Sequence, residues 1–206
     1  MAVVYCIAII LFAYFLGSIP FGYIIGKFNG IDIRTVGSKN IGATNVTRCV
    51  GKKAGKLCFA LDFLKGMLPV LIAQLFKMPE YCVLAALVAS ILGHVFPIYL
   101  KFKGGKGVST AAGAVMALAP LPLLTALVVW VVVFTVSRYV SLASITAAAV
   151  LPVVAWVFTV AGVGSASARS LPALILLTAI AVLAIMRHRS NIQRLLDGTE
   201  SRFGKK

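Results

Sequence analysis

The sequence predicts an all-α integral membrane protein with seven transmembrane helices, one of them short, with its N-terminus outside and its C-terminus in the cytoplasm. Three observations predict this fold class. The 206-residue chain is 61% hydrophobic and has a mean hydropathy of +1.02, more than a water-soluble domain carries. Apolar runs of about 20 residues, the length that crosses a bilayer, recur along the chain. Almost all basic residues lie in the short segments between those runs, as the positive-inside rule expects.

Several apolar runs are long enough to be ordinary spans. The first run has no basic residue before it and continues well past the length of a signal peptide, so we expect it to be retained as a span. The predicted spans are Val3–Gly26, Leu57–Phe76, Tyr81–Leu100, Leu121–Val136, Leu142–Ala161 and Leu171–Met186.

A shorter apolar stretch, GVSTAAGAVMALAP, lies between Lys106 and Pro120. Its twelve or so helical positions reach only about 18 Å at ~1.5 Å per residue, so it is a short span or a re-entrant segment. Charge favours a span, because otherwise Arg138 and the basic tail would lie on opposite sides of the membrane. With seven spans, the outer loops keep only Lys77 and Arg169. We therefore predict one polytopic membrane domain over residues 1–206, with cytoplasmic loops 27–56 and 101–107 and a cytoplasmic tail 187–206.

The net charge of +15 does not require a nucleic-acid partner, because positive-inside topology accounts for the basic residues. The cysteines show no spacing suited to a metal site, so free thiols are expected at Cys6, Cys49, Cys58 and Cys82. A disulfide between Cys6 and Cys82 is less favoured but stays open, since both positions fall near the outer face.

The first polar motif is GSKNIGATNVTR, from Gly37 to Arg48. It combines hydroxyls, amides, basic groups and turn-forming glycines within twelve residues, which favours a binding loop over a solvated loop with a helix cap near Thr44. Its candidate substrate-contacting residues are Ser38, Lys39, Asn40, Gly42, Thr44, Asn45 and Arg48.

The second motif is KFKGGKGVST, from Lys101 to Thr110, which leads directly into the short apolar stretch. Glycines at the start of a helix expose N–H groups that favour an anion, and Lys106 adds a full charge. The P-loop pattern is not met, because Lys106 is followed by glycine. A tight membrane turn with basic anchors is the alternative. The candidate phosphate-binding residues are Gly104, Gly105, Lys106, Gly107 and Ser109.

The third motif, RHRSN, follows the last span. His188 can exchange a proton or hydrogen-bond a phosphate, and Asn191 lies on the same helix face three residues later. The alternative is a topological anchor. Asp197 and Glu200 are expected to shape the tail by capping and by pairing with arginines.

Three ionisable residues lie inside predicted spans. Asp62 and Lys65 stand three residues apart, which suits an internal ion pair that steadies the second span as well as it suits a functional site. His94 precedes Pro97 by three residues and is more simply a packing residue.

The segments GSKNIGATNVTR, GHVFPIYLKFKGGKGVST and RHRSNIQRLLDGTE together resemble the bacterial integral-membrane acyl-phosphate:glycerol-3-phosphate acyltransferases, the PlsY family. GSIPFGYIIGK and LDFLKG match as well, so the likeness covers nearly the whole chain. The resemblance implies a seven-helix acyltransferase of phospholipid synthesis. Such an enzyme transfers a fatty acyl group from acyl phosphate to the 1-hydroxyl of glycerol 3-phosphate, giving 1-acyl-glycerol 3-phosphate (lysophosphatidic acid) and phosphate.

The resemblance also implies catalytic roles for Ser38, Arg48, His188 and Asn191, and a phosphate loop at Gly104–Gly107. It implies no cofactor and no metal. It places the enzyme in the bacterial plasma (inner) membrane with its active site facing the cytoplasm. A soluble enzyme that makes acyl phosphate is the protein partner it suggests, beside membrane lipid. The proton acceptor stays open between His188 and the phosphate of glycerol 3-phosphate.

Two other classes of protein fit the sequence less well. The HxxxxD pair of the other large glycerol-phosphate acyltransferase class is missing, because Tyr99 follows His94 at that spacing and Gln193 follows His188. A transporter of organic phosphate would use similar basic loops. It would also need polar residues through several spans, whereas here the polar residues are concentrated in the predicted cytoplasmic segments.

Overall fold

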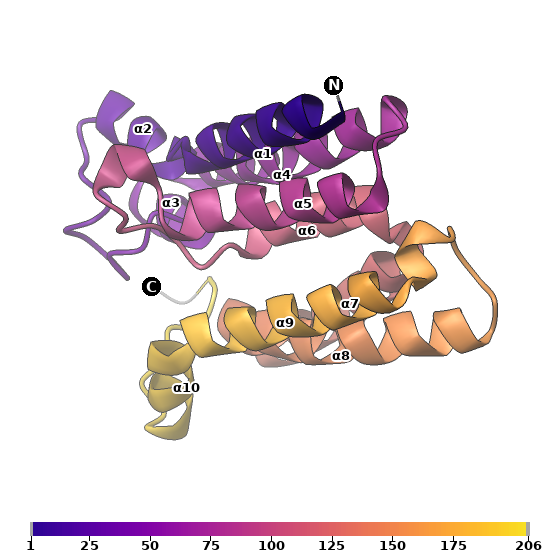
Figure 1. Cartoon of the computed structure of the whole chain (residues 1–206). Coiled ribbons are helices and arrows are strands. Elements are labelled where there is room, and N and C mark those ends of the chain that lie inside the picture. The colour runs from indigo at the N-terminus through magenta and orange to yellow at the C-terminus, as the bar shows by residue number, and fades with distance from the viewer. Residues whose placement is uncertain (1, 205–206) are drawn as a thin grey trace. The chain divides into compact units, whose positions relative to one another are not determined.

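The computed structural model describes residues 2–204, and every regular element in that range is a helix. The chain divides into two compact units, residues 1–117 and 118–206, shown in Figure 1.

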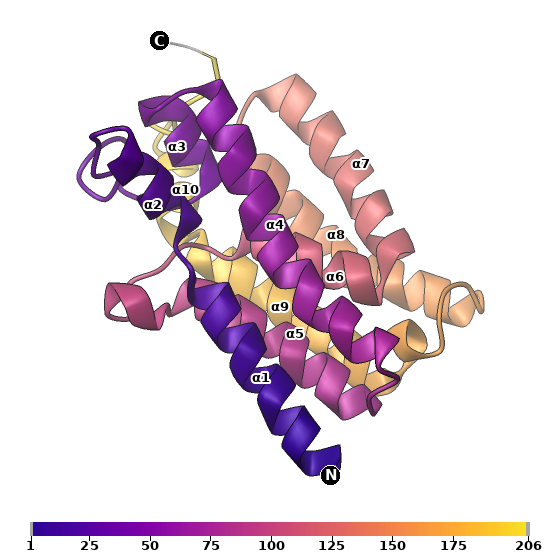
Figure 2. The same cartoon turned by 90° about the horizontal axis from the view of Figure 1, so that it is seen from above.

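The first unit contains six helices and a 3₁₀ turn. They are α1 (Ala2–Ser18), α2 (Phe21–Phe28), α3 (Ala43–Cys49), α4 (Lys52–Leu75), α5 (Glu80–Val95), η1 (Ile98–Leu100) and α6 (Val108–Leu118), whose last residue crosses the unit boundary. The long helices α1, α4 and α5 pack against one another (Figure 2). The break between α1 and α2 falls at Pro20, where the missing N–H interrupts the helical ladder.

Glycines bring these helices into backbone contact. A Cβ built on Gly17 of α1 would lie 2.3 Å from the carbonyl oxygen of Ser90 in α5. Likewise, a Cβ on Gly66 of α4 would meet the Thr110 carbonyl of α6 at 2.0 Å. Small residues commonly allow such close approach between helices in membranes, where packing rather than hydrophobicity drives association.

The second unit contains α7 (Pro120–Ser137), α8 (Val140–Val160), η2 (Ser167–Arg169), α9 (Leu171–Arg187) and α10 (Arg189–Leu196). Helix α8 packs against both α7 and α9. The C-terminal tail returns to the α7–α8 turn, where the Phe203 amide donates to the Arg138 carbonyl at 2.8 Å.

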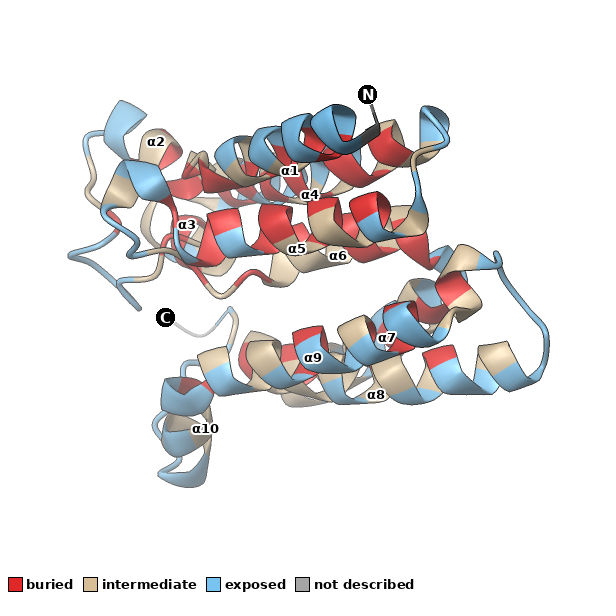
Figure 3. Ribbon diagram, in the orientation of Figure 1, coloured by how far each residue is buried: buried red, intermediate tan, exposed pale blue. Residues whose placement is uncertain are grey.

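The outward faces of the helices are apolar, as a lipid environment requires. Figure 3 shows exposed surface along α1 and α8, and large hydrophobic side chains make up much of it. In α1 these include Val3, Ile7 and Leu11, and in α8 they include Val153 and Val157. Such continuous exposed apolar surface belongs in a bilayer rather than in water.

The helices agree in kind with the predicted multi-pass architecture. Within residues 2–204, five helical segments are long and apolar enough to cross a membrane, and the pair α9 and α10, bent by 55°, brings the number to six if it counts as one span. The stretch before Pro120 does form a short helix, the 11-residue α6. The count of seven spans and their orientation stay predictions.

The expectation of four free thiols is wrong for two of them. Cys6 near the start of α1 and Cys82 near the start of α5 form a disulfide, because the packing of α1 on α5 brings their side chains together. Cys49 and Cys58 are free.

Candidate active site

The first motif forms a compact loop that joins α2 to α3. Ser38 is exposed within it and follows Gly37, whose φ of +59° lies in the left-handed region that glycine adopts without strain. Lys39 has a φ of +57°, uncommon for a residue with a Cβ. The chain therefore turns sharply on both sides of Ser38 and presents its hydroxyl at the surface of the loop.

Asn45 holds this turn in place. Its side-chain oxygen accepts the backbone N–H of Ser38 at 2.8 Å, and its amide nitrogen donates to the carbonyls of Ile33 at 2.9 Å and Val36 at 3.2 Å. Asn45 is only 1% exposed. Both ends of its amide are thus used by the backbone of its own loop, which suits a residue that shapes the site.

Helix α3 begins at Ala43, next to the cap expected near Thr44, but its cap residue is Gly42 and makes no side-chain cap hydrogen bond. The Asn40 side chain instead accepts the Gly42 N–H at 2.8 Å, which closes the turn that leads into the helix. Arg48 lies in the last turn of α3 with its side chain exposed.

The glycines of the second motif pack against the C-terminal end of α5. Gly105 donates its N–H to the His94 carbonyl at 3.2 Å. A Cβ on Gly104 would lie 2.1 Å from that same oxygen, and one on Gly105 would lie 2.2 Å from His94 Nε2. These two glycines are therefore required by close packing. The next residues enter α6 at Val108, so the predicted loop-to-helix transition is confirmed.

Asp62 and Lys65 form the ion pair that their spacing predicts. Lys65 Nζ lies 2.7 Å from Asp62 Oδ1, and the Cys58 thiol donates to Asp62 Oδ2 at 3.7 Å. His94 joins this group from α5, with Nδ1 3.7 Å from Asp62 Oδ1. The sequence did not indicate that His94 would face this pair.

The third motif lies in the second unit, at the bend between α9 and α10. His188 Nδ1 lies 2.7 Å from the Ala184 carbonyl, so its Nδ1 edge is turned back onto α9. The backbone N–H of Asn191 donates to the His188 carbonyl at 2.8 Å. His188 and Asn191 are thus neighbours, as expected. Their participation in one site with the two loops stays a prediction.

Glu200 is a residue whose role the sequence reasoning underestimated. Its Oε1 accepts hydrogen bonds from Asn191 Nδ2 at 2.7 Å and from Ser141 Oγ at 2.9 Å, while Oε2 accepts from Arg194 Nε at 2.7 Å. The pairing with arginine was expected, but the link to Asn191 was not. Burial by itself raises the pKa of Glu200, yet the hydrogen bonds from Asn191, Arg194 and Ser141 outweigh it and hold that pKa below its usual value. The signal in the sequence was the scarcity of acids, since the chain has only five.

Asp32 lies near the start of the loop that joins α2 to α3. It receives a two-pronged contact from Arg34, with Nε 2.9 Å from Oδ1 and Nη2 2.7 Å from Oδ2. These hydrogen bonds hold the pKa of Asp32 well below its usual range. The guanidinium of Arg34 also stacks over the Tyr23 ring at 4.3 Å. Arg34 is exposed, whereas Asp32 and Tyr23 are partly buried, and their contacts stabilise the start of the loop.

The fold and these loops define a multi-pass helical membrane protein with basic, glycine-rich segments suited to phosphate. The model of the glycerol-3-phosphate acyltransferase family matches residues 7–198. The chain belongs to this family and is an acyltransferase.

Relatives and solved structures support the same assignment over nearly full length. The glycerol-3-phosphate acyltransferase of Aquifex aeolicus is 49% identical, covering 95% of this chain and 97% of the relative, and that of Geotalea daltonii is 47% identical, covering 96% and 97%. The crystal structure of PlsY, an integral membrane glycerol 3-phosphate acyltransferase, in its glycerol 3-phosphate form has a TM-score of 0.87 and 48% identity, covering 97% of this chain and 96% of that one. Its lysophosphatidic acid form has a TM-score of 0.85 and 46% identity, covering 97% and 95%.

Proposed function

We propose that this enzyme transfers a fatty acyl group from acyl phosphate to the 1-hydroxyl of glycerol 3-phosphate, releasing phosphate and 1-acyl-glycerol 3-phosphate. The observation that carries the proposal is the pair of solved relatives, one in a glycerol 3-phosphate form and one in a lysophosphatidic acid form. These are the acceptor and the product of the reaction, and the likeness extends over 97% of the chain.

Acyl phosphate suits the chemistry of the loops. The glycerol 3-phosphate hydroxyl oxygen attacks the acyl carbonyl carbon, the bond from that carbon to the phosphate oxygen breaks, and phosphate leaves. Because this donor is already activated, the protein needs mainly to position two phosphates and to stabilise the developing oxyanion. Basic side chains and exposed backbone N–H groups can both position the phosphates and stabilise the oxyanion.

Each motif has a role in this proposal. Lys106, Arg48 and His188 hold phosphate groups, and the Gly104–Gly107 loop and Ser109 surround one of them. Ser38 orients a reacting group from its exposed turn, with Lys39, Asn40, Gly42 and Thr44 forming the rest of that surface. Asn45 acts through the Ser38 backbone that it binds. Asn191 acts beside His188.

The reaction also needs an acceptor for the hydroxyl proton. We favour the phosphate of glycerol 3-phosphate, which is close to its own hydroxyl by covalent connection and needs no protein carboxylate. His188 then stabilises that phosphate by hydrogen bonding or charge. The alternative assigns the proton to the imidazole itself.

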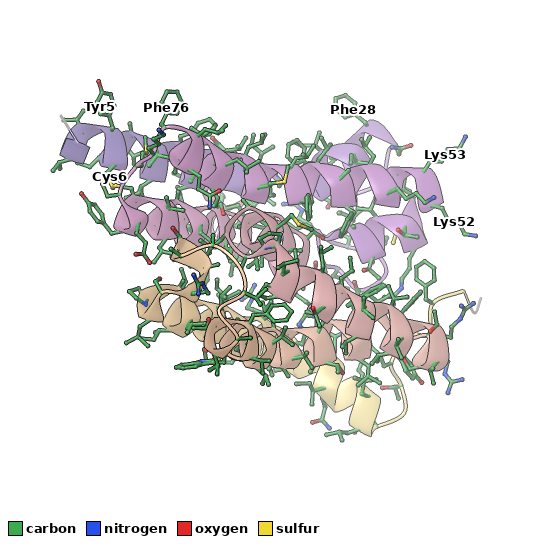
Figure 4. The ribbon with its side chains drawn as sticks, turned by 90° about the vertical axis from the view of Figure 1, so that its right-hand side faces the viewer. Tyr5, Cys6, Phe28, Lys52, Lys53 and Phe76 are labelled. Carbon is green, nitrogen blue, oxygen red and sulfur yellow. A yellow bond between two sulfur atoms is a disulfide. The ribbon has the colours of Figure 1, made fainter. Side chains whose placement is uncertain are left out.

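We further propose that the enzyme lies in the bacterial plasma membrane with both loops of the first unit in the cytoplasm. Figure 4 supports this orientation within that unit, because Cys6 lies at one end of it and Lys52 and Lys53 lie at the other. A disulfide suits the oxidising exterior, and basic residues suit the cytoplasmic side. The acyl tail would remain among the helices or in lipid. A soluble enzyme that makes acyl phosphate would supply the donor.

Phosphate release tests the function directly. Purified protein receives palmitoyl phosphate with and without glycerol 3-phosphate, alongside Ser38→Ala and Lys106→Ala. Thr35→Ala and Lys53→Ala serve as matched controls, since both residues are exposed in the same unit and lie outside the two proposed contact sets. Release that depends on glycerol 3-phosphate and collapses only in the first two variants supports the proposal. If folded protein releases no phosphate in response to glycerol 3-phosphate, the acyltransferase proposal is contradicted and transport of an organic phosphate becomes the favoured function.

A further inference from the structure

A group of ionisable side chains is buried within the first unit, on helices that cross the membrane. Asp62 is 1% exposed, Lys65 is 2% exposed and His94 is 4% exposed. Charged groups at such positions are costly, because lipid and packed side chains solvate them poorly. The mechanism proposed above does not use any of them, so their presence needs another explanation.

One end of this group reaches the break in the first span. Lys65 Nζ donates to the Ile19 carbonyl at 2.7 Å and lies 5.5 Å from the centre of the Phe21 ring. Ile19 and Phe21 flank Pro20, where α1 stops and α2 begins. Lys65 therefore connects α4 to the bend from which α2 leads into the Ser38 loop.

The other end of the group reaches the glycine-rich loop. The Nδ1 edge of His94 faces Asp62 Oδ1 at 3.7 Å, a distance suited to Coulomb attraction rather than to a direct hydrogen bond. Its Nε2 edge lies against Gly105, close enough that any Cβ there would collide with it. The imidazole thus stands between a buried carboxylate and the loop that carries Lys106.

We propose that Asp62, Lys65 and His94 form a buried support that holds the Gly104–Gly107 loop in its phosphate-binding conformation, with His94 as the positioning residue. This inference rests on the proposed function, because it assumes that the loop binds a substrate phosphate. A loop of glycines has high conformational freedom, and ordering it costs entropy at every binding event. If the Asp62–Lys65 pair fixes the His94 ring against Gly105, the loop is already ordered before it binds phosphate, and the entropic cost of binding is smaller. Partners behind a ligand-binding group act similarly in metal sites, where they orient the imidazole.

The competing explanation is that the ion pair only steadies the spans. The double variant Asp62→Asn/Lys65→Met separates the two explanations. It removes both charges of the ion pair, so neither is left buried without its partner. Replacing a buried ion pair by neutral or apolar groups often leaves the free energy of unfolding nearly unchanged. If the group supports the loop, KM for one of the two phosphate substrates rises about tenfold while kcat changes less. If the pair only steadies helices, the folded double variant keeps the wild-type KM for both substrates, which overturns the proposal.

A pair of histidine replacements tests the loop contact itself. The glutamine amide of His94→Gln reaches the Nε2 position against Gly105, whereas the asparagine amide of His94→Asn reaches only the Nδ1 position against Asp62. We expect the larger rise in KM in His94→Asn. Ser90→Ala, one turn earlier in α5, is the control, since the Ser90 hydroxyl donates to the Leu87 carbonyl of its own helix. KM values equal to wild type in both histidine variants contradict the proposal.

Different measurements test the proposed function and the support of the glycine-rich loop. Wild-type phosphate release that depends on glycerol 3-phosphate tests the function alone. The same proteins are also examined by the thermal shift that glycerol 3-phosphate and inorganic phosphate produce, which needs no turnover. A thermal shift that is smaller in the double variant and in His94→Asn than in Ser90→Ala supports the proposed role of the buried group. Equal shifts in all of them refute it, whatever the turnover.

Discussion

Asn45 Oδ1 accepts the backbone N–H of Ser38 at 2.8 Å, so the residue proposed to orient the reacting group is held by a side chain seven positions later. The same amide also fixes the carbonyls of Ile33 and Val36. The position of the serine hydroxyl therefore depends on one buried asparagine, although that side chain need not touch substrate.

Replacing Asn45 by alanine should abolish most activity through this loop. The substitution leaves two carbonyls and one N–H without their partner, and each such buried group costs about 1–3 kcal/mol. We expect kcat to fall by at least about tenfold and hydrogen exchange to increase over residues 33–42. Thr35→Ala is the control, because the Thr35 hydroxyl donates to the Asp32 carbonyl within the same exposed turn. Unchanged exchange together with lost activity would instead indicate that Asn45 contacts substrate.

His188→Gln tests the proton acceptor. Glutamine keeps a hydrogen-bond donor but cannot accept and release a proton at neutral pH. If the substrate phosphate takes the proton, the variant keeps measurable turnover with a higher KM for glycerol 3-phosphate. Steady-state kinetics at several pH values measure this. Complete loss of turnover with unchanged affinity for glycerol 3-phosphate would sink the substrate-assisted mechanism and assign the base to His188.

Thiol labelling can establish the orientation of the first unit. In intact cells, a membrane-impermeant maleimide should label Cys6 and Cys82 only after an impermeant reductant has opened their disulfide. Cys49, which is free and lies in α3 beside the Ser38 loop, should be labelled only in inverted vesicles. Variants that keep one labelled position at a time identify each signal. Labelling of Cys49 from outside intact cells would reverse the proposed topology.

The disulfide should also contribute to stability. It joins positions 76 residues apart and ties the start of α1 to the start of α5. Removing a disulfide costs a typical soluble domain about 2–4 kcal/mol, and less is expected here because the bilayer already restricts the unfolded chain. Cys6→Ser/Cys82→Ser should therefore lower the melting temperature in detergent, with KM unchanged. A changed KM would show that the far ends of these helices influence the site.

The Glu200 carboxylate should make the second unit sensitive to acid. Its pKa is lower in the folded protein than its ordinary value, so its stabilising contribution is complete above the ordinary carboxyl pKa. That contribution is lost as the pH falls through the lowered, folded-state pKa. Melting temperatures between neutral pH and about pH 3 should therefore fall more steeply for wild type than for Glu200→Gln. Asp197→Asn is the control, because that exposed carboxylate accepts from the neighbouring Gln193 side chain at 2.9 Å. Parallel curves for wild type and Glu200→Gln would contradict this role.

The helices and their loops were predictable because hydropathy and charge are local properties of the chain. The apolar run before Phe76, the short helix before Pro120 and the ion pair between Asp62 and Lys65 all follow from residues that are near one another in sequence. The family resemblance rested on the same local motifs. Its candidate residues are therefore the same ones that composition and spacing had selected.

Contacts between distant positions were decided by packing. The Cys6–Cys82 disulfide, the Lys65–Ile19 hydrogen bond and the approach of His94 to Gly105 each join different helices or a helix to a loop. In a bilayer the hydrophobic pattern places a helix across the membrane but does not choose its neighbours, which close packing and buried polar contacts select. The sequence by itself thus determined the class of protein and the residues available for chemistry. Only the tertiary structure decided that Asn45 holds Ser38, that Glu200 holds Asn191 and that a buried histidine lies behind the glycine-rich loop.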